Sequence, residues 1–390
     1  GIPGTVNDAT DKITLTAVNY IDGDYTAGES TEFGSIQTYF SRNATLGGNW
    51  SDVNSWSTDA SLQHAGAPCA APPSSNNIVI AAGHTITCQV ANNNLQSPVA
   101  VINGTLNLNS TNGHNFGIVS GTGTIRMTPN GVNQFIFPGG DYSVFTSNSG
   151  GTFEYSSTVA ATMPLQPTYN HIVFTGGGVK TMANINLLVN GDISINAGSV
   201  TNTNNRNITL MGNWTNSVGL SGFVPGAGMV MLSGTNQNLS GATNFYQLTS
   251  AVNGEKTLYS SIYIGNNLFL DEGIFVTGNN ELVMQSGSTV SGGSATSYVN
   301  GNMRKFLPAA TLNALFEIGD QNFYTPAEIT FTGTILGAGS ILARTDQGDH
   351  ASIYLSGINE TKSCNRTWTL TPTAVSGYTA VSVKLNFNAA

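Results

Sequence analysis

Residues 169–210 read YNHIVFTGGGVKTMANINLLVNGDISINAGSVTNTNNRNITL, and residues 245–284 read FYQLTSAVNGEKTLYSSIYIGNNLFLDEGIFVTGNNELVM. The two segments share an aromatic opening, a Gly-bearing turn, a Lys-Thr pair and then short apolar runs. Lys180 lies 76 residues before Lys256, and Gly198 lies 75 residues before Gly273. We interpret 168–210 and 245–284 as copies of one strand-and-turn unit. Such repeats bury their apolar faces against one another, which predicts a stacked or elongated β architecture.

The composition also indicates an all-β fold. Only 8% of the 390 residues are charged, whereas 39% are hydrophobic and 46 are Gly. This balance is not that of a disordered chain, which has high net charge and little apolar content. Helix formers are scarce, and no long amphipathic run with a 3.6-residue period is present.

Residues 41–298 hold many short strands that end at Asn-Gly, Gly-Thr-Gly or Gly-His turns. This pattern predicts a right-handed parallel β-helix, or β-solenoid, with polar Asn and Thr stacked in columns at its corners. At roughly 20 residues per coil, the helix would have about ten or eleven coils and a length of about 50 Å. The alternative is a string of small antiparallel β domains.

The composition changes near residue 299. Residues 299–390 alternate apolar and polar residues at period two, which predicts a small antiparallel β-sandwich domain with its own core. Its final strand runs so close to Ala390 that the sandwich could be truncated there. Residues 1–40 contain one strand, KITLTAVNY, and read as an N-terminal strand and linker segment.

Charge and hydropathy limit the classes of partner that the chain is expected to bind. The net charge is −9 with only 12 Lys and Arg, so no basic stripe is available for phosphates and we expect no nucleic-acid partner. No run of 18 apolar residues exists, which argues against direct membrane insertion. The opening GIPGTVNDAT lacks the features of a signal peptide, so we expect a mature protein or an excised piece of a larger one.

Trp50 and Trp56 are separated by SDVNS. Two indoles among polar residues could form a sugar-stacking platform, with Asp52 and Asn54 bonding the hydroxyl groups. They could equally plug the open end of a β stack, which must cover its apolar core. The second interpretation is the favoured one.

Asp22 and Asp24 bracket Gly23 in a loop. This acidic pair could hold Ca²⁺ if backbone carbonyls completed the shell, although a solvated turn explains it as well. No other cofactor is predicted.

Cys69 and Cys88 flank a Pro-rich bend and a strand, a spacing that suits a disulfide bond. Two unrelated buried thiols are the alternative. Cys364 is then left without a partner in the sequence.

No catalytic residues are predicted. The acidic residues of the helical region are scattered, and only Asp271 and Glu272 are adjacent, where strand geometry points neighbours to opposite faces. The histidines show no metal-ligand spacing, and no nucleophile, zinc or phosphate-loop motif is present. We therefore expect a protein that is not an enzyme.

Several phrases together resemble one family. They are GDYTAGESTEFGS, TYFSRNATLGGNWSDVNSWS, NNIVIAAGHTITC, YVNGNMRKF, FEIGDQNFYTPAEITFTG and NRTWTLTP. The chain is similar in these phrases to the very large surface proteins of Bacteroidetes, including the gliding-motility adhesins exported by the type IX secretion system. The family's C-terminal sorting signature does not occur by Ala390, so the resemblance implies an internal fragment of a longer adhesin.

The resemblance implies an extracellular, cell-surface module that presents a repetitive β rod for attachment or gliding motility. Its expected partners are surface glycans or polysaccharides, the type IX secretion machinery and neighbouring modules of the same long chain. One alternative is a carbohydrate-binding module, in which Trp50, Trp56, Trp214 or Tyr263 would line an exposed face. Another is a β-helix polysaccharide lyase or hydrolase, which would need a cleft with clustered acids.

Overall fold

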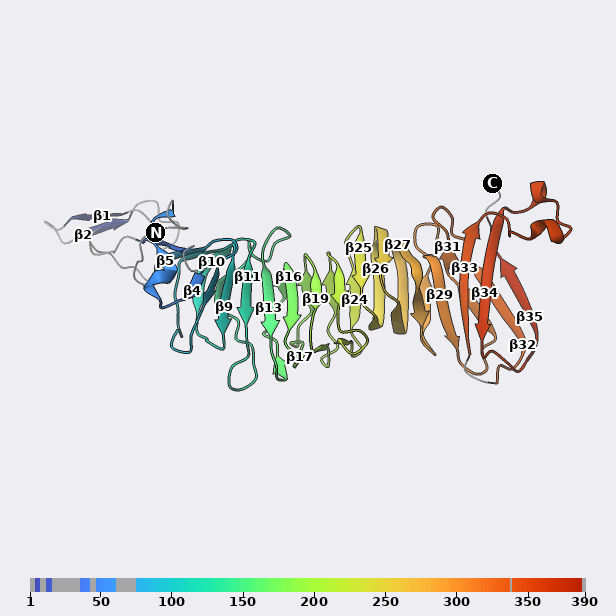
Figure 1. The fold of residues 1–390 in the computed structure, drawn as a ribbon, viewed down its shortest axis with the longest axis horizontal. Coiled ribbons are helices and arrows are strands. Elements are labelled where there is room, and N and C mark those ends of the chain that lie inside the picture. Colours follow the sequence, from blue (N-terminus) through green and yellow to red (C-terminus); the bar gives the residue numbers. More distant parts are fainter. Residues whose placement is uncertain are drawn as a thin grey trace.

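A computed structural model of the chain describes residues 4–7, 12–15, 36–42, 47–60, 75–336 and 339–387. Within these ranges the chain forms 35 β-strands and no α-helix. Short 3-10 turns occur at Val53–Ser55, Ile353–Leu355 and Glu360–Lys362. Figure 1 shows a long rod of stacked strands with a wider end at the C-terminus. The predicted all-β class is confirmed.

The rod is a parallel β-solenoid, as the sequence predicts, with about 12 turns against the ten or eleven coils expected. Successive coils pair in parallel, so that Thr105 pairs with Thr124 and Thr124 with Thr152, at separations of 19 and 28 residues. In the first coils one face of the solenoid is a parallel sheet, with β5 (Trp56–Ser57) antiparallel to β3 at its edge. The parallel strands of this sheet are β3 (Thr38–Ser41), β6 (Asn77–Ile80), β8 (Val99–Ile102), β10 (Asn115–Ser120) and β12 (Gly139–Asp141).

A second, longer ladder runs the length of the rod. It comprises β4 (Gly47–Asn49), β7 (Thr85–Thr87), β9 (Thr105–Asn109), β11 (Thr124–Met127), β13 (Thr152–Ser156), β16 (His171–Thr175), β19 (Ile193–Ile195), β22 (Trp214–Asn216), β25 (Gln237–Ser240), β26 (Thr243–Leu258) and β27 (Ile262–Met284). Beside it stack β15 (Thr168–Tyr169), β18 (Leu187–Val189), β21 (Ile208–Leu210), β24 (Met229–Leu232) and β28 (Thr289–Gly292). A third face in the middle coils holds β14 (Ala161–Thr162), β17 (Val179–Thr181), β20 (Ser199–Thr201) and β23 (Phe223–Val224). Near the N-terminus, β1 (Gly4–Asn7) pairs antiparallel with β2 (Lys12–Leu15).

Alternating side chains build the interior, because successive residues of a strand point to opposite faces. The inward residues of the long ladder stack in register from coil to coil as one buried column. Its members are Ile86, Leu106, Ile125, Phe153, Ile172, Ile193, Trp214, Leu239 and Leu258. Each fully buried side chain of this kind stabilises the fold by about 1.5–3 kcal/mol. A coil cannot bury this column alone, so stacking is what closes the core.

Polar columns line the corners, as the sequence predicts. The Asp192 carboxylate accepts a hydrogen bond from the backbone N–H of Asn213 (2.6 Å), and the Asn213 side chain accepts one from the N–H of Asn238 (2.9 Å). A parallel column runs from Asn186 to the N–H of Asn207 and from Asn207 to the N–H of Met229. Each side chain thereby satisfies a backbone donor of the next coil, which a turn would otherwise leave unpaired.

The two repeat-marking lysines are fully buried. Lys256 Nζ donates to the backbone carbonyls of Gly234 (2.7 Å), Thr235 (3.0 Å) and Val252 (3.1 Å). Lys180 Nζ donates to the carbonyls of Gly176 and Ala197. Burial lowers the pKa of both lysines to about 8, so the ammonium form still predominates at pH 7. The repeat therefore conserves a charged cross-link between turns of neighbouring coils.

The C-terminal end is a small antiparallel sandwich, as predicted. One sheet continues the long ladder through β29 (Val299–Leu307), β33 (Gly339–Gln347) and β34 (Arg366–Thr373), with β31 (Ile318–Gly319) parallel to β29. The other sheet has the order β30 (Asn313–Phe316), β32 (Ala327–Gly333) and β35 (Tyr378–Leu385).

The predicted boundary at residue 299 coincides with the first residue of β29. This strand pairs in parallel with β27 of the solenoid and antiparallel with β33 of the sandwich. Ile329 and Ile341 of the sandwich belong to the same buried cluster as the solenoid column. The sandwich thus shares one continuous core with the rod instead of having the separate core expected from the sequence.

Candidate functional site

Trp50 and Trp56 lie inside the first coil. Their side chains are 3% and 0% exposed, their rings meet edge to face at 5.1 Å, and Trp56 Nε1 donates to the Trp50 carbonyl (2.8 Å). Phe116 of β10 packs beside Trp50, with the ring centroids 6.4 Å apart. Neither indole has a face open to a sugar ring, which disfavours the sugar-stacking alternative and agrees with the favoured capping interpretation. The pair instead fills the apolar interior at this end of the described stack, where stacking can no longer cover it.

Other predicted site residues lie outside the described residues or inside the core. Asp22, Asp24 and Cys69 fall outside the described ranges, so the calcium site and the Cys69–Cys88 disulfide stay predictions. Cys88 is buried, and burial raises the pKa of its thiol to about 12. Cys364 is free and exposed. Trp214 is buried against Phe223 and Phe245, which leaves no face for a ligand.

A Ser–His pair that the sequence did not reveal lies in the first coils. Ser41 Oγ is 2.8 Å from His84 Nδ1, a spacing found between nucleophile and base in hydrolases. Ser41 is fully buried, however, and its oxygen accepts the backbone N–H of Ala81 (2.8 Å). This buried oxygen therefore links the first two coils by hydrogen bonds.

His114, like His84, makes buried hydrogen bonds inside the rod. Its Nδ1 accepts the backbone N–H of Leu95 (3.2 Å), and its Nε2 lies 2.9 Å from Thr111 Oγ1. Burial lowers the pKa of His114 to about 4, which matches a neutral ring that accepts at one nitrogen and donates at the other.

Several acidic side chains of the rod form ion pairs between coils. Glu154 pairs with Arg126 (3.3 Å), and Glu281 makes two short contacts to Arg304 (2.6 and 2.8 Å). Among the residues that the structure describes, no group of three or more His, Cys, Asp or Glu side chains could hold a metal ion. The described part of the rod therefore presents ion pairs between coils and no acidic cluster.

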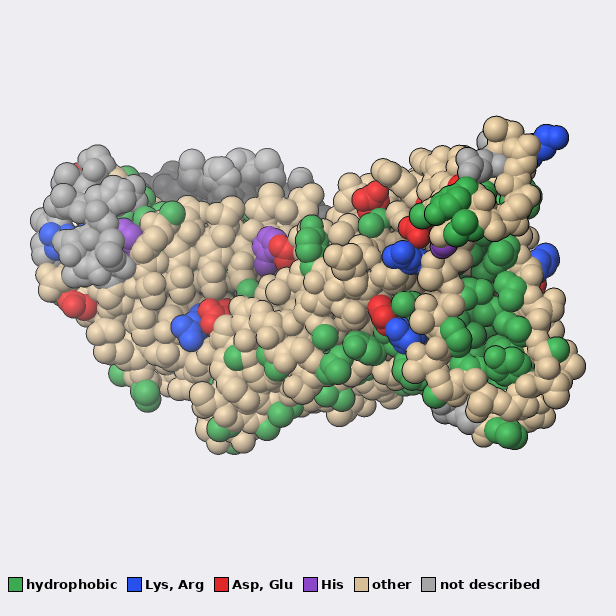
Figure 2. All heavy atoms as spheres, turned by 45° about the vertical axis from the view of Figure 1, so that its right-hand side comes forward, with side chains coloured by type: hydrophobic (Ala, Val, Ile, Leu, Met, Phe, Trp, Pro, Cys, Tyr) green, Lys and Arg blue, Asp and Glu red, His purple; other side chains and the backbone are tan. Residues whose placement is uncertain are grey.

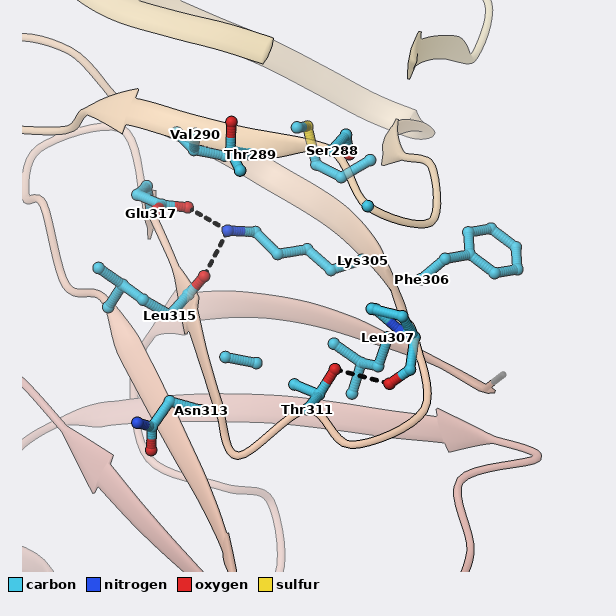
Figure 3. A pocket seen from close by; sticks show the side chains of 14 residues that line it. Ser288, Thr289, Val290, Lys305, Phe306, Leu307, Thr311, Asn313, Leu315 and Glu317 are labelled. Atoms are coloured by element: carbon cyan, nitrogen blue, oxygen red, sulfur yellow. Dashed lines mark hydrogen bonds and ion pairs between the residues drawn. The ribbon is translucent and has the colours of Figure 1, made fainter. Parts of the chain in front are cut away.

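A pocket of about 400 Å³ lies where the rod meets the sandwich (Figure 3). Lys305 Nζ points into it, 2.7 Å from Glu317 Oε2, and also donates to the Leu315 carbonyl. Burial lowers the pKa of Lys305, while the Glu317 carboxylate acts in the opposite direction. Both charges are already paired, and the rest of the lining mixes polar side chains such as Ser288 and Asn313 with apolar ones such as Leu307.

A second buried ion pair fixes the sandwich. Arg366 on β34 lies 2.7 Å from Asp320 Oδ2. Burial alone would raise the pKa of Asp320, but backbone N–H bonds from Asn322 and Phe323 and the Arg366 guanidinium together hold it below its usual range. The pair anchors the start of β34 to the loop before β32.

An open apolar surface lies beyond these pairs, at the end of the sandwich (Figure 2). We name it the C-terminal apolar face and define it by the inward residues of β35, which remain exposed: Tyr378 (38%), Val381 (48%), Val383 (43%) and Leu385 (39%). These residues register with buried Phe331, Ile329 and Ala327 of β32, so they belong to the core side of the sheet. Contiguous exposed apolar surface of this kind marks an interaction site. It is the candidate functional site of the chain.

Comparison of the chain with protein-family models, curated proteins and solved structures finds no match. In the described residues, no helix is long and apolar enough to cross a membrane.

Proposed function

We propose that the chain is an extracellular, rod-shaped module of a large bacterial surface protein, which spaces and presents attachment surfaces during adhesion or gliding. The observation that carries the proposal is the solenoid itself: about 12 stacked turns bound by a continuous ladder. At about 4.8 Å per coil such a stack spans about 55–60 Å. A spacer between a cell and a surface needs such a length.

The side of the rod supports the same proposal. Figure 2 shows it covered largely by uncharged polar side chains and backbone, with few charges. Asn, Ser and Thr point outward while the apolar column points inward, and the corner columns tie each coil to the next. A surface of this kind stays hydrated without attracting nucleic acid or anionic lipid. The backbone ladder and corner bonds resist tension, because a coil cannot leave without breaking several bonds together.

The sequence phrases similar to Bacteroidetes surface adhesins support the extracellular setting. Under this proposal the type IX secretion machinery exports the protein, and neighbouring modules and surface glycans are its partners. The carbohydrate-binding alternative loses its main candidates, because Trp50, Trp56 and Trp214 are core residues. We therefore propose a scaffold without catalysis of its own.

Surface labelling of the producing cells tests the proposal. Antibodies against the purified chain should label intact cells, and mild protease treatment of those cells should remove the label. Fab fragments of the antibodies should also reduce attachment to, or movement on, a solid surface, whereas Fab fragments against a cytoplasmic protein should not. Label that emerges only after permeabilisation would refute the extracellular role.

A further inference from the structure

The sandwich has two terminal strands with free edges. β34 pairs only with β33, and β35 pairs only with β32 among the described strands. Because the ladder runs β27, β29, β33, β34 along the rod, the free edge of β34 faces away from the solenoid. A four-residue connection leads from β34 to β35, which places the second edge at the same end (Figure 1). The rod therefore ends in two unpaired strands with the C-terminal apolar face between them.

β35 is the less protected of the two edges. Proteins usually block a free edge with proline, inward charges or bulges. β34 carries Pro372 and Arg366. β35 has eight residues and no proline, and its one charge, Lys384, lies on the face opposite Val383 and Leu385. Its pairing with β32 is irregular only at its start, between Tyr378 and Ala380. An incoming strand would therefore meet apolar side chains and free backbone groups on β35.

We propose that the C-terminal apolar face is a dimer interface, in which β35 pairs antiparallel with β35 of a second copy about a two-fold axis. The two sandwiches then form one continuous sheet of six strands, and each copy covers the open end of the other. Since both edges lie at the end of the rod, the copies join tail to tail and the rod doubles in length. This pairing goes beyond the proposed scaffold role and does not depend on where the protein is located.

The occupant is a second copy because β35 is complementary to itself. An antiparallel pairing centred on Ser382 sets Val381 opposite Val383 of the second copy and Lys384 opposite Ala380. Apolar side chains then meet apolar ones on the inner face, and no like charges lie opposite each other on the outer face. A two-fold interface needs this self-complementarity and closes after two copies.

The N-terminal end of the described stack offers no equivalent surface. Trp50 and Trp56 fill the first coil, and β5 lies antiparallel at its edge. Head-to-tail growth would have to bury the apolar face of β35 against this filled coil. The tail-to-tail dimer is therefore the assembly that the two ends favour.

Sedimentation velocity and small-angle scattering of the whole chain over a range of concentrations test the proposal. We expect a dimer whose maximum dimension is about twice that of the monomer. A dimer of unchanged length would mean side-by-side pairing and would overturn the proposal. A chain that stays monomeric throughout would overturn it as well, leaving the apolar face to a strand from a different source.

Two substitutions separate the interface from general destabilisation. Val383→Lys places a charge on the inner face and should weaken dimerisation at least about tenfold, because a core contact is lost in both copies at once. Thr330→Lys places the same charge on the outer face of the adjoining strand and should change the dimer constant by less than about twofold. Equal effects of the two substitutions would contradict the proposal.

A cysteine cross-link gives a readout that tolerates partial destabilisation. In a Cys364→Ser background, Ser382→Cys places the same residue of both copies opposite each other. Mild oxidation should then give a disulfide-linked dimer, whereas Thr330→Cys in the same background should not. Cross-linking of both variants to the same extent would show random collision and refute the register.

Discussion

Replacement of Lys256 by Met should open one turn of the solenoid. Lys256 is fully buried, and its ammonium group donates to the carbonyls of Gly234, Thr235 and Val252. Methionine keeps the length and nearly the volume of the side chain, so the change removes the donor with little change in packing. The three carbonyls then lose their charged partner.

The expected cost follows from the number of bonds. A hydrogen bond to a charged group contributes about 1.5–3 kcal/mol, although three bonds to one ammonium are not additive. The variant also escapes the cost of burying a charge, which offsets part of the loss. We expect Lys256→Met to lower the free energy of unfolding by about 3 kcal/mol, and Lys180→Met, with two bonds, by about 2 kcal/mol.

Urea unfolding at pH 7, followed by far-ultraviolet circular dichroism, measures these costs. Hydrogen exchange should show faster exchange at residues 233–258 in Lys256→Met than in the parent, because a solenoid can open locally. Lys362→Met is the matched control, since Lys362 is exposed, and it should change stability by less than about 0.5 kcal/mol. If Lys256→Met behaved like this control, the buried ammonium would not be a cross-link and the reasoning would be wrong.

Three further predictions concern the rod. Burial holds the pKa of His114 at about 4, below its unfolded value of about 6.5. The stability that the neutral ring contributes is therefore complete above pH 6.5 and is lost as the pH falls to 4. In urea titrations His114→Gln should lack about 3 kcal/mol of this loss in the free energy of unfolding, and an unchanged pH profile would contradict the assignment. Gly241→Ala should lower the free energy of unfolding by more than about 3 kcal/mol, because φ is +83° and the new Cβ would lie 1.8 Å from the Asn216 carbonyl oxygen. Gly278→Ala, at φ +55° in open space, should lower it by about 1 kcal/mol. Equal melting temperatures of the two variants would count against the close packing of turns. Trp56→Ala should cost about 3–5 kcal/mol in the same unfolding assay and leave glycan binding unchanged, and a loss of glycan binding without a loss of stability would restore the sugar platform.

Local sequence patterns were sufficient for the fold class. Strand alternation acts over two residues and turn residues act over four, so both are legible in any short window. The Lys180–Lys256 repeat gave the stacking, and the Asn-rich corners gave the polar columns that bind successive coils. These features are set by short sequence windows and by their recurrence along the chain, and the structure confirms them.

The residues of the candidate site could not be predicted from local sequence patterns in the same way. A spacing of six residues leaves open whether Trp50 and Trp56 face solvent or the interior, and only the coils stacked around them decide it. The Ser41–His84 contact joins residues 43 positions apart, and no sequence motif predicts it. The exposure of Val381 and Val383 depends on which strand lies beside β35, a property of the sheet order and not of the strand itself.

The sequence by itself determined an all-β chain with a repeated strand-and-turn unit, low charge and a change of character near residue 299. The tertiary structure alone decided that the sandwich shares β29 and its core with the rod, that the repeat lysines bond carbonyls up to 22 residues away, and that one end is filled while the other is open. The division has a physical reason. Strand and turn preferences are set by local backbone and side-chain sterics, whereas burial and exposure are set by which distant coils meet.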